Sequence, residues 1–174
     1  MDVKSKIRSV PDFPKPGILF RDITTLLKDK DAFTYVVDEL YNQYREMKID
    51  KVVSVESRGF IFGSVLAYRL NAGFVPIRKP GKLPAEVVRE EYQLEYGKDA
   101  MEVHKDAIVK GDRILVHDDL LATGGTVDAA CRLVERLGGE IIGLCFLIEL
   151  SSLGGRERLK GRDIFSIISY DSEN

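Results

Sequence analysis

The stretch from Ile114 to Thr126, ILVHDDLLATGGT, contains the residue types that a phosphate site requires. An apolar run leads into two carboxylates, and paired glycines follow between two threonines. Glycines let backbone amides converge on an anion, threonine hydroxyls add donors, and the N-terminus of a following helix adds a positive dipole end. The pattern predicts a phosphate-monoester cradle made of Thr123, Gly124, Gly125 and Thr126.

The two carboxylates, Asp118 and Asp119, need a separate role because they would repel a phosphate. They can accept hydrogen bonds from two vicinal hydroxyls one sugar length away, or help to hold a cation. A ribose 5-phosphate has this layout. An isolated acidic or glycine pair is more simply a helix cap or a turn, but the whole string favours a site. No lysine follows the glycines as in a P-loop, and no GxGxxG motif occurs.

The elements that must position this site alternate between helix and strand. Apolar residues recur at helical spacing from Asp31 to Met47, and Lys51 to Val55 follows as a β-branched run. We predict further elements as follows: a helix at about 59–70, strands at 74–77 and 113–117, a helix at about 125–137 and an apolar strand at 141–148. Such alternation is typical of βαβ units. We therefore expect an α/β fold with a single doubly wound, mostly parallel sheet flanked by helices, and the cradle at the carboxyl end of a strand.

Two segments lie outside this alternation. Residues 11–25, PDFPKPGILFRDITT, begin with three prolines and a glycine in seven residues, which predicts an ordered irregular cap. Residues 79–106 are long, charged and interrupted by prolines and glycines, which favours a flexible lid. Within the lid, residues 91–96 and 101–104 alternate well enough for a loose hairpin. We expect both segments to belong to one domain spanning residues 1–174.

The composition limits the classes of function. A chain of 174 residues that is 44% hydrophobic can bury one sizeable core. Its 26 basic and 28 acidic side chains nearly cancel, so no overall field would hold it on nucleic acid or an anionic membrane. The first ten residues mix charges and no run approaches roughly 18 apolar residues, so we expect neither a secretory signal nor a membrane-spanning helix. Cys131 and Cys145 fall in patterns of buried elements, so we expect free thiols and a cytoplasmic location.

The strand, the two acidic residues and ATGGT together resemble the phosphoribosyl pyrophosphate signature of type I phosphoribosyltransferases. The resemblance to the adenine-specific subfamily covers nearly the whole chain, through FPKPGILFRDITTLL (13–27), ESRGFIFG (56–63), IRKPGKLP (77–84) and LEYG (94–97). It implies purine salvage by a homodimer that joins the ribose 5-phosphate of phosphoribosyl pyrophosphate to adenine, giving AMP and pyrophosphate. Magnesium would arrive on the pyrophosphate, without a dedicated metal site. Two alternatives stay open: transfer to hypoxanthine or xanthine, and a non-catalytic phosphoribosyl pyrophosphate sensor.

The resemblance also assigns roles on the sugar and pyrophosphate side. It implies that Ala122, Thr123, Gly124, Gly125 and Thr126 hold the 5-phosphate and that Asp118 and Asp119 meet the ribose hydroxyls. Arg58 would meet the pyrophosphate, and Arg78, Lys79 and Lys82 are further candidates. A leaving pyrophosphate needs fixed cations where negative charge develops, so the chemistry agrees. For Lys82, a solvated surface position is an equal alternative.

On the base side, the family places the irregular segment 11–25 as a hood. Leu19 and Arg21 would offer main-chain groups to the purine edge, and Phe20 would stack on its ring, although an isolated Phe is more commonly a core aromatic. Glu102, in the lid, matches the family carboxylate for purine proton transfer. Without the resemblance it would be an exposed, solubilising residue.

The sequence departs from the family pattern at two positions. His117 precedes the aspartates where an apolar residue would be simpler, and Glu56 occupies a place where the family often has Asp. We expect His117 to be a satisfied core residue that could tune the Asp pair. His104, in the lid, is expected to face solvent.

Overall fold

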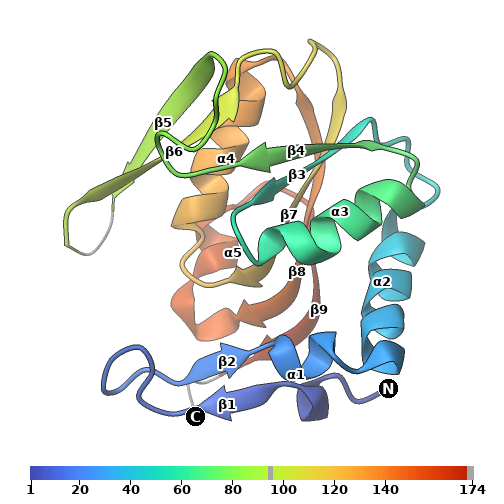
Figure 1. Cartoon of the computed structure of the whole chain (residues 1–174), viewed down its shortest axis with the longest axis vertical. Coiled ribbons are helices and arrows are strands. Elements are labelled where there is room, and N and C mark those ends of the chain that lie inside the picture. The colour runs from blue at the N-terminus through green and yellow to red at the C-terminus, as the bar shows by residue number, and fades with distance from the viewer. Residues whose placement is uncertain (94–95, 172–174) are drawn as a thin grey trace.

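A parallel five-stranded sheet lies at the centre of the structure, a computed structural model that describes residues 1–93 and 96–171 (Figure 1). The strands follow the order β4-β3-β7-β8-β9, and every neighbouring pair is parallel. Their bounds are Lys51–Val55 (β3), Gly73–Ile77 (β4), Arg113–Leu121 (β7), Glu140–Leu150 (β8) and Ile164–Tyr170 (β9). The predicted α/β class with a mostly parallel sheet is therefore confirmed.

Helices cover both faces of the sheet. Their bounds are Lys30–Tyr44 (α2), Gly59–Arg69 (α3) and Gly125–Arg136 (α4). Neighbouring strand residues point to opposite faces, so Val52 packs with α2 and α3 while Val53 packs with α4. Helix α2 begins where the Asp29 side chain accepts hydrogen bonds from the amides of Asp31 and Ala32, at 3.0 and 3.1 Å. Two separate cores result, one on each face, as a doubly wound sheet requires.

Strand β7 is longer than the predicted run of 113–117. It continues through the aspartate pair to Leu121, because β8 pairs with it as far as Glu149. The carboxylates therefore belong to the last part of a strand, and the turn begins only at Ala122. The final strand, β9, was not predicted at all.

The segment expected as a flexible lid contains an antiparallel hairpin of β5 (Val87–Gln93) and β6 (Lys98–His104). It is longer than the predicted loose hairpin and packs beside α4 (Figure 1). Met101 and Val103 are buried in the α4-side core. Arg132 and Arg136 of α4 both bind the Glu90 carboxylate, at 2.9 and 3.0 Å. The hairpin is thus docked on the helix that begins at the cradle. Leu94 and Glu95 of the LEYG motif lie outside the described residues.

The N-terminal elements lie beside the carboxyl ends of β8 and β9 (Figure 1). Strands β1 (Arg8–Val10) and β2 (Phe20–Asp22) pair in antiparallel fashion, and the short helix α1 (Thr24–Leu27) follows. The irregular conformation predicted for residues 11–25 is confirmed for 11–19, which belong to no helix or strand, and is wrong for most of 20–25, which form β2 and the start of α1. A second short helix, α5 (Gly155–Arg158), precedes β9. Among the described residues, every helix is too short or too polar to cross a membrane.

Helix α3 approaches β3 closely because Gly63 faces Ser54. A Cβ atom at Gly63 would lie 2.0 Å from Ser54 Oγ and 3.0 Å from Ser54 Cβ. The Ser54 hydroxyl is fully buried and has no hydrogen-bond partner among the described residues. The position therefore excludes a side chain on steric grounds.

Gly63→Ala should lower the free energy of unfolding by about 1–3 kcal/mol, because overpacking forces backbone shifts. Adding Ser54→Ala should recover part of the loss, since it removes the nearest conflicting atom. Denaturant unfolding of the two single variants and the double variant measures this coupling. Ser64→Ala, at the exposed next position of α3, is the control and should change stability by less than about 0.5 kcal/mol. Strictly additive effects at positions 54 and 63 would refute the contact.

Candidate active site

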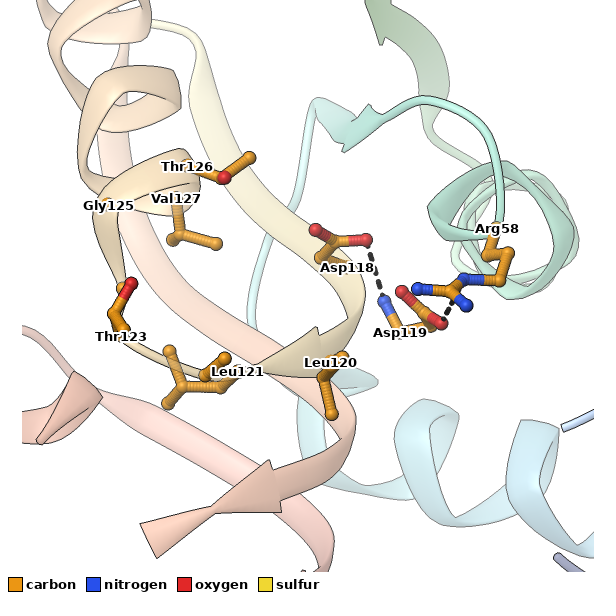
Figure 2. A pocket seen from close by; sticks show the side chains of 11 residues that line it. Arg58, Asp118, Asp119, Leu120, Leu121, Thr123, Gly125, Thr126 and Val127 are labelled. Carbon is orange, nitrogen blue, oxygen red and sulfur yellow. Dashed lines mark hydrogen bonds and ion pairs between the residues drawn. The ribbon is translucent and has the colours of Figure 1, made fainter. Parts of the chain in front are cut away.

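The turn between β7 and α4 lines a cavity of about 200 Å³ (Figure 2). Gly124 caps α4 with φ at +84°, a left-handed conformation that glycine adopts without strain. All five residues of the predicted cradle line the cavity: Ala122, Thr123, Gly124, Gly125 and Thr126. Arg58, Asp118 and Asp119 line the same cavity. The structure therefore brings the predicted phosphate cradle, both carboxylates and one cation together.

The cradle is supported from behind by α5, which sequence reasoning missed. A Cβ atom at Gly155 would lie 2.6 Å from the Ala122 carbonyl oxygen and 2.8 Å from Leu121 Cδ1. From the other side, a Cβ atom at Gly124 would lie 3.2 Å from the Gly155 carbonyl oxygen. Gly124 and Gly155 thus allow the backbone of the cradle and the backbone of α5 to lie in contact. The only sequence signal was the third Gly-Gly pair of the chain, at positions 154 and 155, which is typical of an ordinary turn.

An ion pair holds this support in place. Arg156 Nε and Nη2 donate to the two oxygens of Glu149, at 2.7 and 2.9 Å. Glu149 is buried at the end of β8, where it pairs in register with Leu121. Arg158, the last residue of α5, lies beside the first turn of α4, with its Nε 3.9 Å from Asp128 Oδ2. A bidentate pair to a buried carboxylate fixes geometry well, so α5 forms a rigid wall.

Asp119 contacts both Arg58 and Asp118 (Figure 2). Arg58 Nε lies 2.9 Å from Asp119 Oδ2, and the Asp119 amide donates to Asp118 Oδ1 at 2.8 Å. Part of Asp118 remains accessible, but protein surrounds most of its carboxyl group. This desolvation, followed by the charge of Asp119, raises the pKa of Asp118 well above its usual range, while Arg58 opposes the shift. The raised pKa favours the uncharged form of Asp118, which repels an anion less than a carboxylate does.

A second cavity of about 110 Å³ lies next to the first. Its lining residues are Ile18, Leu19, Phe20, Arg21, Arg58, Asp119, Leu120, Ile148 and Leu150. The two cavities share Arg58, Asp119 and Leu120. The Arg58 guanidinium carbon lies 5.1 Å from the centre of the Phe20 ring, and the Phe13 ring contacts Phe20 edge-on at 5.0 Å. Phe20 belongs to neither described core, so the alternative of a core aromatic is wrong.

The remaining predicted cations lie at the base of the hairpin. Arg78 Nε is 3.2 Å from Glu56 Oε1, and Lys79 Nζ pairs with Asp99. Lys82 is exposed. The lining of the two cavities, as the described residues define it, contains none of these three cations. The structure therefore places Arg58 in the lining of the site and the other three outside it.

Glu102 is buried, with 8% of its surface exposed. The alternative that it is an exposed, solubilising residue is therefore wrong. Its Oε1 accepts a hydrogen bond from the Gly81 amide at 2.9 Å, and it is not among the residues that line the two cavities. His104 is only half-buried, and its Nε2 accepts from the Ala85 amide at 3.3 Å, so it does not simply face solvent.

His117 is fully buried on the sheet face opposite Asp118. Its Nδ1 lies 3.4 Å from Cys145 Sγ, but its Nε2 has no partner among the described residues. The expectation of a satisfied core histidine is therefore only half correct. Burial lowers the pKa of His117 to about 4, so the ring is neutral at neutral pH.

Comparison with known proteins places this site in a family context. Residues 24–173 match the model of the phosphoribosyl transferase domain. An adenine phosphoribosyltransferase of Solibacter usitatus is 62% identical over 98% of both chains. Another, from Acidobacterium capsulatum, is 60% identical over 97% of this chain and 93% of its own. The Thermoanaerobacter pseudethanolicus enzyme structure superposes with a TM-score of 0.94 at 53% identity, covering 97% and 98% of the two chains. The structure of the Saccharomyces cerevisiae adenine phosphoribosyltransferase, complexed with an imino-altritol bisphosphate and adenine, superposes with a TM-score of 0.90 at 40% identity. The match covers 96% of this chain and 97% of the yeast chain.

The buried His117 ring predicts a specific pH dependence of stability. Below pH 6.5 the unfolded chain takes up a proton on this histidine, whereas the folded protein resists protonation until about pH 4. The free energy of unfolding should therefore fall as pH decreases through this window, losing about 3 kcal/mol at pH 4. His117→Val should remove this part of the slope in denaturant titrations and leave the region above pH 7 flat relative to wild type. Parallel curves for the two proteins would show that the folded state protonates His117 freely.

Proposed function

The chain belongs to the adenine phosphoribosyltransferases of the phosphoribosyl transferase domain family, and we propose from this premise how its two cavities divide the reaction. The enzyme transfers ribose 5-phosphate from phosphoribosyl pyrophosphate to adenine in purine salvage, giving AMP and pyrophosphate. The observation that carries the division of roles is the wall common to both cavities, formed by Arg58, Asp119 and Leu120. The anomeric carbon would lie where the cavities meet.

The first cavity is the proposed site of the ribose 5-phosphate. Residues 122–126 would surround the phosphate with backbone amides and hydroxyls at the start of α4. Asp118 and Asp119 would bind the two ribose hydroxyls. The raised pKa of Asp118 supports this role, because a protonated carboxyl both donates and accepts hydrogen bonds. It also leaves less negative charge beside the phosphate.

The second cavity is the proposed adenine site. Phe20 would stack on the purine, while main-chain groups of Leu19 and Arg21 would select its edge. Displacement with oxocarbenium character would then form the bond from the base nitrogen to the anomeric carbon and break the C–O bond, whose electron pair leaves with pyrophosphate. The proton of the base nitrogen would pass to water or to a carboxylate, for which the family resemblance suggests Glu102. Arg58 lies between the two cavities, so it can meet that charge. The hairpin β5–β6 would serve as the lid that excludes competing water.

Magnesium would enter as part of the substrate, bound to the oxygens of the pyrophosphate. Among the described residues there is no cluster of three or more His, Cys, Asp or Glu able to hold a metal ion. The carboxylates of Asp118 and Asp119 line the sugar cavity and are suitable acceptors for waters on such an ion. When bound, the ion would neutralise part of the leaving-group charge.

We also propose a cytoplasmic homodimer, as the family suggests. Cys131 and Cys145 are buried free thiols, which suits a reducing compartment. Tyr68 of α3 exposes 83% of its surface and offers an apolar contact to a second copy. Light scattering on the purified protein tests the assembly.

Activity on adenine, guanine, hypoxanthine and xanthine tests the function and the base site together. The wild type should form AMP from adenine and phosphoribosyl pyrophosphate and discriminate against the other three bases. Phe20→Ala should weaken adenine binding about tenfold or more, because base–aromatic stacking contributes roughly 1–3 kcal/mol. The KM for phosphoribosyl pyrophosphate should change little. Preference for hypoxanthine or xanthine would support the first alternative function, and binding without turnover would support the sensor.

Gly155→Ala should raise the KM for phosphoribosyl pyrophosphate by roughly tenfold or more, because a displacement of about 1 Å in a binding loop is costly. The new methyl group would collide with the Ala122 carbonyl and move the cradle. The KM for adenine should change less than about twofold, since the adenine cavity has other walls. Ser152→Ala, an exposed change just before the same helix, is the control. Equal effects on both substrates would contradict the role of α5 as the wall of the cradle.

A further inference from the structure

The turn of residues 78–82 links β4 to the hairpin and carries three cations: Arg78, Lys79 and Lys82. Its conformation is set by two carboxylates from different segments, Glu56 just after β3 and Glu102 within β6. Neither was assigned such a role from the sequence. Cations on an unsupported surface turn would be flexible and would repel one another. The contacts that order the turn therefore decide whether the three cations can bind one anion together.

Glu56 holds the first half of the turn. Its Oε1 accepts from Lys79 N at 2.7 Å and from Arg78 Nε at 3.2 Å. Its own amide donates to the Ile77 carbonyl at 3.0 Å, so β3 and β4 remain joined beyond their paired residues. Glu56 directly follows β3 and lies two residues before Arg58. It thus connects the turn to the chain segment that carries the cation of the site.

Glu102 holds the second half of the turn. Its main chain exchanges two hydrogen bonds with Arg78, at 3.0 and 2.8 Å, and its Oε1 accepts from Gly81 N at 2.9 Å. Gly81 has φ at +81°, so this amide is presented by a conformation that favours glycine. A carboxylate is costly to bury without hydrogen bonds, and the Gly81 amide supplies one. The contact is therefore specific.

The Lys79 side chain provides a third contact that holds the turn. Its ammonium group pairs with Asp99 of β6, and the Tyr92 hydroxyl donates to the same carboxylate at 3.1 Å. Lys79 is thus already directed by the hairpin. The turn and the hairpin form one hydrogen-bonded unit, and a pyrophosphate would bind to cations whose backbone is fixed in advance.

We propose that Glu56 and Glu102 act as positioning residues, a carboxylate clamp that orders the turn 78–82 so that its cations meet the pyrophosphate. The inference rests on the proposed function, because it needs pyrophosphate beside this turn. Without the clamp, the side chains would have to be ordered during binding, at an entropic cost for each. The loss should fall on phosphoribosyl pyrophosphate and spare adenine. The clamp also gives Glu102 a different role from the proton transfer that the family resemblance implied.

The clamp and proton transfer predict different effects of the substitution Glu102→Gln. The amide oxygen of Gln can still accept from Gly81 N, so the clamp requires Glu102→Gln to remain close to wild type. Glu102→Ala removes the acceptor, and it should raise the KM for phosphoribosyl pyrophosphate by roughly tenfold while the KM for adenine changes less than about twofold. Proton transfer requires instead that Gln be as damaging as Ala, with a single-turnover rate lower by about 10²–10⁴-fold. Single-turnover measurement is needed because lid opening can mask the chemical step.

Glu56→Ala and Glu56→Gln provide a second pair of variants, which keeps the test decisive if Glu102→Ala fails to fold. Glu56→Ala should also raise the KM for phosphoribosyl pyrophosphate selectively, and Glu56→Gln should raise it less. Glu91→Ala, on the exposed side of β5, is the matched control and should leave both KM values unchanged. An unchanged KM for phosphoribosyl pyrophosphate in folded Ala variants would overturn the clamp, as would a Gln variant as slow as Ala. A wild type that makes no AMP would refute the proposed function instead.

Discussion

The ion pair between Arg58 and Asp119 joins the chain just beyond β3 to the end of β7, and the site is arranged around it. The two strands are parallel neighbours, so their carboxyl ends meet at one edge of the sheet and opposite charges lie 2.9 Å apart. Asp119 is buried, whereas the Arg58 side chain is 42% exposed. The pair thus combines a fixed carboxylate with a cation that a ligand can reach. Because both residues line both cavities, the pair also connects the proposed sugar and base sites.

Charge balance is the second constraint on this edge of the sheet. An anionic substrate needs cations, and cations whose side chains are ordered in advance bind it at a lower entropic cost. Here each predicted cation but the exposed Lys82 is paired with a carboxylate: Arg58 with Asp119, Arg78 with Glu56, and Lys79 with Asp99. Such pairs contribute little to stability when exposed. Their more direct effect is to fix the directions of the cationic side chains.

The sequence alone determined the fold class and the main polar residues of the first cavity, which we propose as the sugar site. Short apolar strands separated by amphipathic helices permit little except a covered parallel sheet, and β3 was predicted to the residue. The cradle and the aspartate pair were predictable because they are contiguous in the chain, so backbone connectivity alone brings them together. The same holds for the irregular conformation of residues 11–19, since proline and glycine act locally.

Only the tertiary structure decided the contacts between segments far apart in sequence. Gly155 gave only the local signal of an ordinary Gly-Gly turn, because its effect depends on the Ala122 carbonyl oxygen 2.6 Å from where its Cβ would lie. The burial of Glu102 depends on the bridge to Arg78, and the docking of the hairpin depends on arginines of α4. The second nitrogen of His117 likewise has no partner among the described residues, which depends on what packs around the ring. Hydrophobic period and turn chemistry act over a few residues, whereas close approach and burial are properties of the assembled chain, which no local pattern encodes.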